Sequence, residues 1–439
     1  MSQTALAPHL HRPIAAGQRL HVLDVLRGFA LLGIVLANVQ YFAGLFFLEM
    51  VGAVASSPLD EAVHVAIEVL VHGKFYSLFS LLFGIGCALF LGRAEAKGLA
   101  ARPLFRRRLW ILLGIGGVHA LLLWAGDILM IYALLGFALV PFYGRSSRTL
   151  LTWATGLLAL PIVAYAVMWA AGITDPLAPP PADPGAASAP EDGFNPILFM
   201  ITGFQGGYLD VLGANLVQLV GRWVDVIMSF RLPRVLGLFV LGLWVGQRGL
   251  LHDLEAHAGL LRRVAAWGLG LGLALNGAMA YFVADVAPFL PGSPLGMAEV
   301  VVGAVGVPVL MLGYTAGIAL LMRSGGVARV LMRLAPVGRM ALTNYLLQTV
   351  ICMVLFYGLG FGLYGQVGTA AATAIGLAIF VVQVPLSQWW LGRYRFGPAE
   401  WVWRRLTYRV PLALRHADAA VPGSPHETSL PTPAHSPTS

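Results

Sequence analysis

The residues best suited to chemistry are His119 and Asp127, on either side of a short turn within an apolar stretch. The segment reads GVHALLLWAGDILMIYA over residues 117–133. Gly126–Asp127 predicts a turn between two helices, so a modest bend brings the carboxylate to the imidazole. A carboxylate that orients a histidine makes it a better general base. The alternative is that Asp127 caps the second helix and His119 makes one interhelical hydrogen bond.

The first long apolar stretch carries an acid, a cation and an amide. Asp24 and Arg27 are three residues apart and share a helical face, whereas Asn38 lies about 21 Å farther along the axis than Asp24. We predict a charged pair near one membrane surface and an amide deep in the bundle. The alternative is an interfacial ion pair with an asparagine that only packs helices, because both would be sheltered from lipid.

Other polar side chains in apolar stretches are candidates for a shared cavity. Asn344 and Gln348 lie one helical turn apart in the segment GRMALTNYLLQ and could line a polar path. Hydrogen bonding between helices is the alternative. We assign six side chains to the predicted cavity: Asp24, His72, Lys74, Tyr132, Asn344 and Gln348.

A further polar group precedes the apolar stretch that starts at Lys74. His64, Glu68 and His72 repeat every four residues and therefore share a helical face. Such spacing could bind a metal, but the sequence offers no further ligand nearby. A solvated or headgroup-facing surface is favoured, and we expect no metal site.

These side chains must be positioned by membrane-spanning helices. Hydrophobic residues make up 58% of the chain and charged residues 11%, whereas soluble domains contain about 25% charged residues. The composition predicts an all-α, polytopic membrane helical bundle in contact with lipid. About ten spans are predicted from the apolar stretches: 23–47, 74–92, 107–125, 127–143, 149–171, 234–250, 262–284, 299–322, 338–361 and 369–391.

The positive charges predict the orientation of these spans. If the amino terminus is cytoplasmic, only four of the 28 Lys and Arg residues fall outside: Lys74, Arg222, Arg231 and Arg234. Because basic residues collect on the cytoplasmic side, both termini are predicted to be cytoplasmic. Topology and anionic lipid account for the net charge of +8, so nucleic-acid binding is not needed to explain it.

The chain divides at a Pro/Ala-rich stretch, residues 172–196. The segment 197–230 is apolar but interrupted by charges, which favours an amphipathic or partly inserted helix over an eleventh span. The predicted parts are a cytoplasmic tail (1–22), a first five-helix half (23–171), an external linker with the amphipathic segment (172–233), a second five-helix half (234–391), an interfacial helix (392–412) and a disordered cytoplasmic tail (413–439).

Four motifs in order resemble the YeiB-like bacterial inner-membrane proteins, whose carboxy-terminal portion is a domain of unknown function. These motifs are LDVLRGFALLGIVLANVQ, the hairpin HALLLWAGDILMIYA, GRMALTNYLLQTVIC and FGPAEWVWRRLTY. The resemblance covers residues 19–409 and implies a multi-pass protein of the bacterial inner membrane.

The opening motif also resembles, more distantly, the acyltransferase-3 proteins and the heparan-glucosaminide acetyltransferases. The chain departs from the acyltransferase-3 pattern at Asn38, where that family has His; the heparan-type enzymes have Asn there. The heparan-type enzymes also carry a His in the following external loop, for which His64 and His72 are the only candidates here.

The distant resemblance implies transfer of an acyl group from a cytoplasmic donor, such as acyl-CoA, to an extracytoplasmic acceptor. His119 would then take the acceptor's proton, Asp127 would orient His119, and Asn38 would donate a hydrogen bond to the developing oxyanion. Four arginines would hold the donor phosphates: Arg27, Arg106, Arg107 and Arg108. No tightly bound cofactor is expected. The alternatives are a transporter or exporter of a small solute and a structural membrane subunit.

Overall fold

The computed structural model describes residues 20–53, 56–172, 194–283 and 294–416. The all-α prediction is confirmed for these residues, whose only strand-like feature is an isolated bridge between Tyr394 and Arg415. The helices are α1 (His21–Phe42), α2 (Leu45–Met50), α3 (Pro58–Leu70), α4 (Lys74–Ala96), α5 (Ala101–Leu122), α6 (Leu129–Leu139), η3 (Val140–Phe142), α7 (Ser147–Ala170), α8 (Pro196–Phe204), α9 (Tyr208–Met228), α10 (Arg231–Gln247), α11 (Ala258–Val283), α12 (Pro294–Leu321), α13 (Gly325–Leu331), η4 (Met332–Leu334), α14 (Ala335–Arg339), α15 (Ala341–Phe356), α16 (Thr369–Arg393) and α17 (Pro398–Tyr408).

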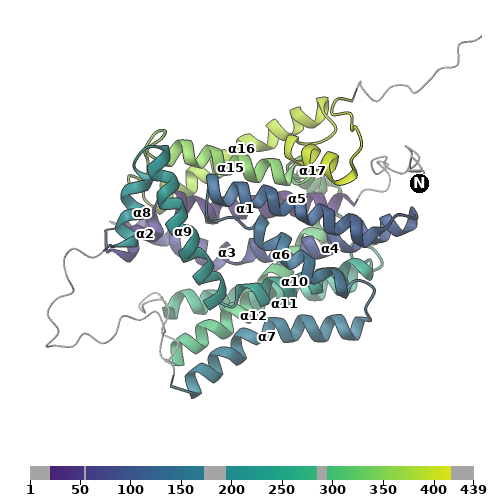
Figure 1. Ribbon diagram of the computed structural model, residues 1–439. Helices are drawn as coiled ribbons and strands as arrows, with labels where there is room; N and C mark the ends of the chain where they lie inside the picture. Colours follow the sequence, from purple (N-terminus) through teal and green to yellow (C-terminus); the bar gives the residue numbers. More distant parts are fainter. Residues whose placement is uncertain (1–19, 54–55, 173–193, 284–293, 417–439) are drawn as a thin grey trace, which may run out of the picture.

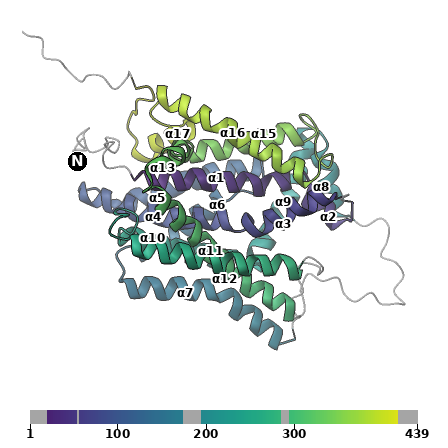
Figure 2. The same ribbon diagram turned by 180° about the vertical axis from the view of Figure 1, so that it is seen from behind.

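The long helices run side by side as a bundle (Figures 1 and 2). Helix α1 lies inside it, whereas α7 and α16 lie at opposite margins. One end of the bundle carries α2 and α8, and the other carries α13 and α17. The predicted tails and most of the linker at 172–196 fall outside the described residues.

Seven helical segments of the described chain are long and apolar enough to cross a membrane, and the bent pair α13–α14 and α15 makes an eighth if counted as one span. The chain is therefore a polytopic helical membrane protein. All ten predicted spans overlap helices, but α6 and α10 are short and α5 begins with a run of arginines, so these three do not qualify alone. Helix α9 does qualify by length and composition, although it runs obliquely to the bundle in Figure 1.

The second predicted span, 74–92, lies within α4, which begins at Lys74. The preceding helix α3 begins at Pro58, where the Ser57 side chain accepts a hydrogen bond from the Asp60 N–H and the Asp60 carboxylate accepts one from the Ser57 N–H. Helices α3 and α4 follow one another across a short break and together form one long candidate span, Pro58–Ala96. Lys74, at the break, is buried.

Small residues bring the helices into close contact. A Cβ atom at Gly338 of α14 would lie 1.8 Å from the Asp24 carbonyl oxygen of α1, and one at Gly242 of α10 would lie 2.1 Å from the Leu81 carbonyl oxygen of α4. In a lipid bilayer the hydrophobic effect does not bring helices together, so helices associate through small residues that let their backbones pack closely. These contacts hold α1, α4, α10 and α14 together around the interior.

Candidate functional site

His119 is held at the end of α5 by contacts from two other parts of the chain. Asp127 Oδ1 lies 2.9 Å from His119 Nδ1, and Thr349 Oγ1 of α15 lies 2.9 Å from His119 Nε2. The His119 and Asp127 side chains are each 1% exposed. The structure therefore brings together the two residues of the predicted pair and adds a hydroxyl from the other half of the chain.

The connection between α5 and α6 explains this arrangement. Helix α5 ends at Leu122 and α6 begins at Leu129, so Asp127 lies in the turn between them. Its second oxygen, Oδ2, accepts a hydrogen bond from the Met130 N–H at 2.7 Å. The carboxylate thus caps α6 with one oxygen and contacts the imidazole with the other, so the capping bond and the contact with His119 are present together.

The chemistry of the partners assigns the donor and acceptor in each of these hydrogen bonds. An ionised carboxylate only accepts hydrogen bonds, so His119 Nδ1 carries a proton. In the neutral ring Nε2 then accepts from the Thr349 hydroxyl. This order, carboxylate to imidazole to hydroxyl, is the one that lets a histidine withdraw a proton from an alcohol.

Helix α9 closes over this hairpin through Asn215. The Asn215 Oδ1 accepts from the Ala125 N–H at 2.6 Å, and its Nδ2 donates to the Ala120 and Leu121 carbonyl oxygens. Asn215 is 1% exposed. One buried amide therefore satisfies backbone groups freed by the end of α5 and fixes the turn that carries Asp127.

Helix α15, which carries Thr349, is anchored at its start by α17. The half-buried Glu400 carboxylate accepts hydrogen bonds from the Leu342 and Thr343 N–H groups, at 2.7 and 3.2 Å. Burial raises the pKa of Glu400, and the hydrogen bonds from Thr343 and Leu342 act in the opposite direction. The preceding helix bends by 78° at this junction, so Glu400 fixes the direction in which α15 enters the bundle.

Asn344 and Gln348 lie in a hydrogen-bonded network between α15 and α16. Asn344 Nδ2 donates to Ser387 Oγ at 3.0 Å, and Gln348 Nε2 donates to Gln383 Oε1 at 2.8 Å. Gln383 Nε2 in turn donates to the Asn344 carbonyl oxygen. These contacts are those of helix-to-helix bonding, the alternative to the predicted cavity lining.

Three further residues of the predicted cavity, Tyr132, Lys74 and His72, have other hydrogen-bond partners. The Tyr132 hydroxyl donates a hydrogen bond to the Tyr76 carbonyl oxygen at 2.8 Å, and it also forms a hydrogen bond with Ser80 Oγ at 2.8 Å. Lys74 is buried and its Nζ donates to the Glu68 carbonyl oxygen at 2.6 Å. The His72 side chain is 50% exposed and its Nδ1 lies 2.6 Å from Glu68 Oε1. In the described part of the chain, no three His, Cys, Asp or Glu residues are grouped as metal ligands.

On α1 the predicted ion pair is present. Arg27 Nη1 donates to Asp24 Oδ1 at 3.0 Å, as expected for residues three apart on a helix. Asn38 is half-buried, and the structure records no hydrogen bond between its side chain and any described residue. In the described part of the chain, the hydrogen bonds of the His119 ring go to Asp127 and Thr349, and none joins it to Asn38.

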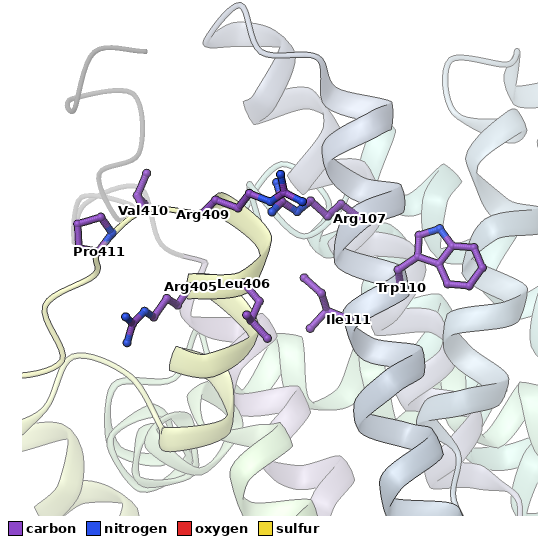
Figure 3. Close-up of a pocket in the computed structure, with 8 residues that line it drawn as sticks. All are labelled: Arg107, Trp110, Ile111, Arg405, Leu406, Arg409, Val410 and Pro411. Atoms are coloured by element: carbon purple, nitrogen blue, oxygen red, sulfur yellow. The ribbon is translucent and has the colours of Figure 1, made fainter. Parts of the chain in front are cut away.

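The three consecutive arginines of α5 have different surroundings. Arg106 is exposed, whereas the Arg108 guanidinium lies over the Trp403 ring, 3.6 Å from its centroid. Arg107 lines a groove of about 700 Å³ between α5 and α17 (Figure 3). The structure therefore places their side chains in three different environments.

An arginine cluster at the α9–α10 junction was not predicted as a site. Arg222 and Arg231 both contact the Asp225 carboxylate, at 2.9 and 3.1 Å, and Arg234 donates to the Ser229 carbonyl oxygen at 3.0 Å. The buried Nε atoms of all three arginines have no hydrogen-bond partner among the described residues. Two arginines thus share the Asp225 carboxylate, and a third, Arg234, lies close by on α10.

The sequence did contain a signal for this cluster. Arg222, Arg231 and Arg234 are three of the four cations that the charge count leaves on the outer side, where basic residues are scarce. Phe230, between them, adopts a left-handed backbone conformation with φ of 49°. Residues other than glycine rarely adopt it, and such strain is concentrated at functional positions.

The chain is similar along nearly its whole length to bacterial proteins. It is 33% identical to the uncharacterized protein YxaH of Bacillus subtilis, over 90% of this chain and 96% of that protein. It is 29% identical to the uncharacterized protein YeiB of Escherichia coli, over 88% of this chain and 96% of that protein. Residues 245–410 match the family described as protein of unknown function, DUF418. The chain belongs to the DUF418 family.

An uncharacterized 39.9 kDa protein from Bacillus acidopullulyticus is also 30% identical, over 92% of this chain and 98% of that protein. Membership of the DUF418 family confirms the resemblance to YeiB-like proteins that the four sequence motifs indicate. None of these descriptions names an activity. The family therefore establishes a multi-pass membrane protein with bacterial relatives and leaves the reaction to the site chemistry.

Proposed function

We propose that this protein is a membrane-embedded acyltransferase in which His119 is the general base. The proposal rests on the buried series Asp127, His119 and Thr349, with both ring nitrogens of His119 at 2.9 Å from an oxygen. Thr349 Oγ1 marks the position at Nε2 that an acceptor hydroxyl takes when it displaces Thr349. The distant resemblance to membrane acyltransferases supports the choice of reaction.

The reaction follows from these roles. His119 Nε2 takes the proton of the acceptor hydroxyl, and the oxygen attacks the carbonyl carbon of a thioester donor such as acyl-CoA. Asp127 stabilises the imidazolium that forms, and Asn38 donates to the oxyanion. The C–S bond breaks, the ester forms, and the leaving thiolate takes the proton from His119. Arg27, at the end of α1 paired with Asp24, is the residue we assign to the donor phosphates.

The arginine cluster supports an acceptor that carries negative charge. Arg222 lies two helical turns beyond Asn215 on α9 and therefore on the same helical face. Asn215 contacts the turn that holds Asp127. Of the cluster, Arg222 and Asp225 belong to α9, which covers the proposed base, and Arg231 and Arg234 at the start of α10 add two positive charges just beyond its end.

The test measures CoA release from acetyl-CoA by the purified full-length protein in lipid nanodiscs, with sn-glycerol 3-phosphate as the anionic hydroxyl acceptor. We expect His119→Gln and Asp127→Asn to lower the rate by about 100-fold or more. His252→Gln, at an exposed histidine between α10 and α11, is the matched control and should retain the rate. Thermal unfolding in detergent verifies that each variant is folded.

Two results would overturn the proposal. One is a rate of CoA release that is unchanged in folded His119→Gln. The other is counterflow of a labelled solute in proteoliposomes without any CoA release, which would indicate a transporter. Thr349→Val distinguishes direct transfer to the acceptor from transfer through an acetylated Thr349. Direct transfer predicts that this variant retains at least a tenth of the normal rate. An acetyl group found on Thr349 in the unmodified protein would contradict direct transfer.

A further inference from the structure

We propose that the groove between α5 and α17 binds the phosphate headgroup of an anionic glycerophospholipid. The groove has a volume of about 700 Å³ and lies at the end of the bundle that carries α13 and α17 (Figures 1 and 3). Its walls are Arg107, Trp110, Ile111, Arg405, Leu406, Arg409, Val410 and Pro411. The proposal is independent of the acyltransferase function.

The groove is positively charged and is therefore suited to bind an anion. Arg107, Arg405 and Arg409 line it, and no acidic residue is among the lining residues. In Figure 3 the Arg409 side chain extends from α17 toward α5, and the Arg107 side chain extends from α5 toward α17. Two guanidinium groups facing each other repel, and a phosphate between them accepts hydrogen bonds from both.

The backbone conformation of Arg409 supports a specific role for its side chain in the groove. Arg409 ends α17 in the left-handed conformation, with φ of 54°. This conformation is unusual for a residue with a long side chain and costs conformational energy. The strained turn directs the guanidinium into the groove.

The apolar wall of the groove distinguishes a lipid from a soluble phosphate. Trp110 is 64% exposed and Leu406 is 50% exposed, although both are large and apolar. A tryptophan beside arginines is typical of a membrane interface, where the ring lies at headgroup level. Basic pockets between helices at this level bind anionic lipid headgroups. The phosphate therefore lies between the arginines and the acyl chains run along Trp110 and Leu406.

The experiment measures retention of lipid by the full-length protein. The protein is delipidated in detergent, incubated with vesicles of either dioleoyl phosphatidylglycerol or dioleoyl phosphatidylcholine, and analysed by native mass spectrometry. We expect preferential binding of phosphatidylglycerol, and a loss of at least fivefold in the double variant Arg107→Gln/Arg409→Gln. Arg106→Gln removes an exposed neighbouring charge outside the groove and should bind as the unmodified protein does.

Two further measurements distinguish weaker lipid binding from misfolding of the variant, and a lipid phosphate from a soluble phosphate. The double variant Arg107→Lys/Arg409→Lys keeps both positive charges but loses the planar guanidinium groups, which can each donate two hydrogen bonds to one phosphate. It should therefore bind phosphatidylglycerol several-fold more weakly. Phosphatidylglycerol should raise the Tm of the unmodified protein more than that of this variant. Equal binding of the two lipids, or unchanged binding in both double variants, would contradict the proposal. Saturable binding of inorganic phosphate that displaces phosphatidylglycerol would assign the groove to a soluble ligand instead.

Discussion

At the scale of single residues, several buried polar side chains in the described part of this protein form hydrogen bonds between helices. A polar group in hydrocarbon is costly unless it is paired. Asn344, Gln348 and Tyr132 meet this requirement by joining helices. His119 differs, because its two partners are a carboxylate and a hydroxyl in an order that allows proton transfer.

Asn215 is the residue whose loss most directly tests the hairpin. Asn215→Ala removes three hydrogen bonds and leaves the Ala125 N–H without its acceptor, so we expect a loss of about 1–3 kcal/mol in stability. Thermal unfolding in detergent measures it, and the rate of CoA release should fall because Asp127 is no longer held.

Asn276→Ala is the matched control. Asn276 is buried too, but its Nδ2 donates to the Gly272 carbonyl oxygen within its own helix, α11. We expect a smaller loss of stability and a normal rate. Equal losses for the two variants would show that Asn215 has no special part in holding the hairpin.

At the scale of helices, close packing depends on glycines that face a neighbouring backbone. Helices α4 and α10 meet at Gly84 and Gly242, where added Cβ atoms would lie within about 2 Å of a carbonyl oxygen on the other helix. The same principle joins α11 to α12 at Gly268 and Gly313. A single added methyl group must therefore push such a pair apart.

Gly242→Ala tests this packing. The new methyl group would overlap the Leu81 carbonyl oxygen, so we expect a loss of at least about 1–3 kcal/mol, seen as a lower Tm in detergent. Gly270→Ala on α11 has no atom within 4 Å of the added carbon. It should be neutral or stabilising because alanine favours a helix over glycine by about 1 kcal/mol. A harmless Gly242→Ala would refute the α4–α10 contact.

At the scale of the whole molecule, the distribution of charge and the bundle together define two ends. We predict that the end with α13 and α17 is cytoplasmic, because the predicted cytoplasmic loops contain all but four of the Lys and Arg residues. Both native cysteines, Cys87 and Cys352, are buried and free, so engineered cysteines can report on orientation.

Single cysteines at the two ends test this orientation. Ser56 lies just before α3 and Arg148 at the start of α7, and both are exposed. In intact cells a membrane-impermeant maleimide should label Ser56→Cys, whereas Arg148→Cys should react only after permeabilisation. Labelling of Arg148→Cys in intact cells would reverse the assignment.

The sequence alone determined the helical membrane architecture, the family and the contacts between near neighbours. Apolar stretches of membrane length dictate helices, because a chain in lipid must satisfy its own backbone hydrogen bonds. Helical periodicity brings Arg27 to Asp24, and a short turn brings Asp127 to His119, since neither contact needs a third element.

Only the tertiary structure decided which distant segments complete the site. Thr349 reaches His119 across 230 residues, and Asn215 reaches Ala125 across 90. The bend before α15 and the arginine cluster at the α9–α10 junction also depend on the tertiary structure. Hydrophobic periodicity specifies that a helix is buried, but its partners and rotation are set by where small residues allow two backbones to meet, which one stretch of sequence cannot specify.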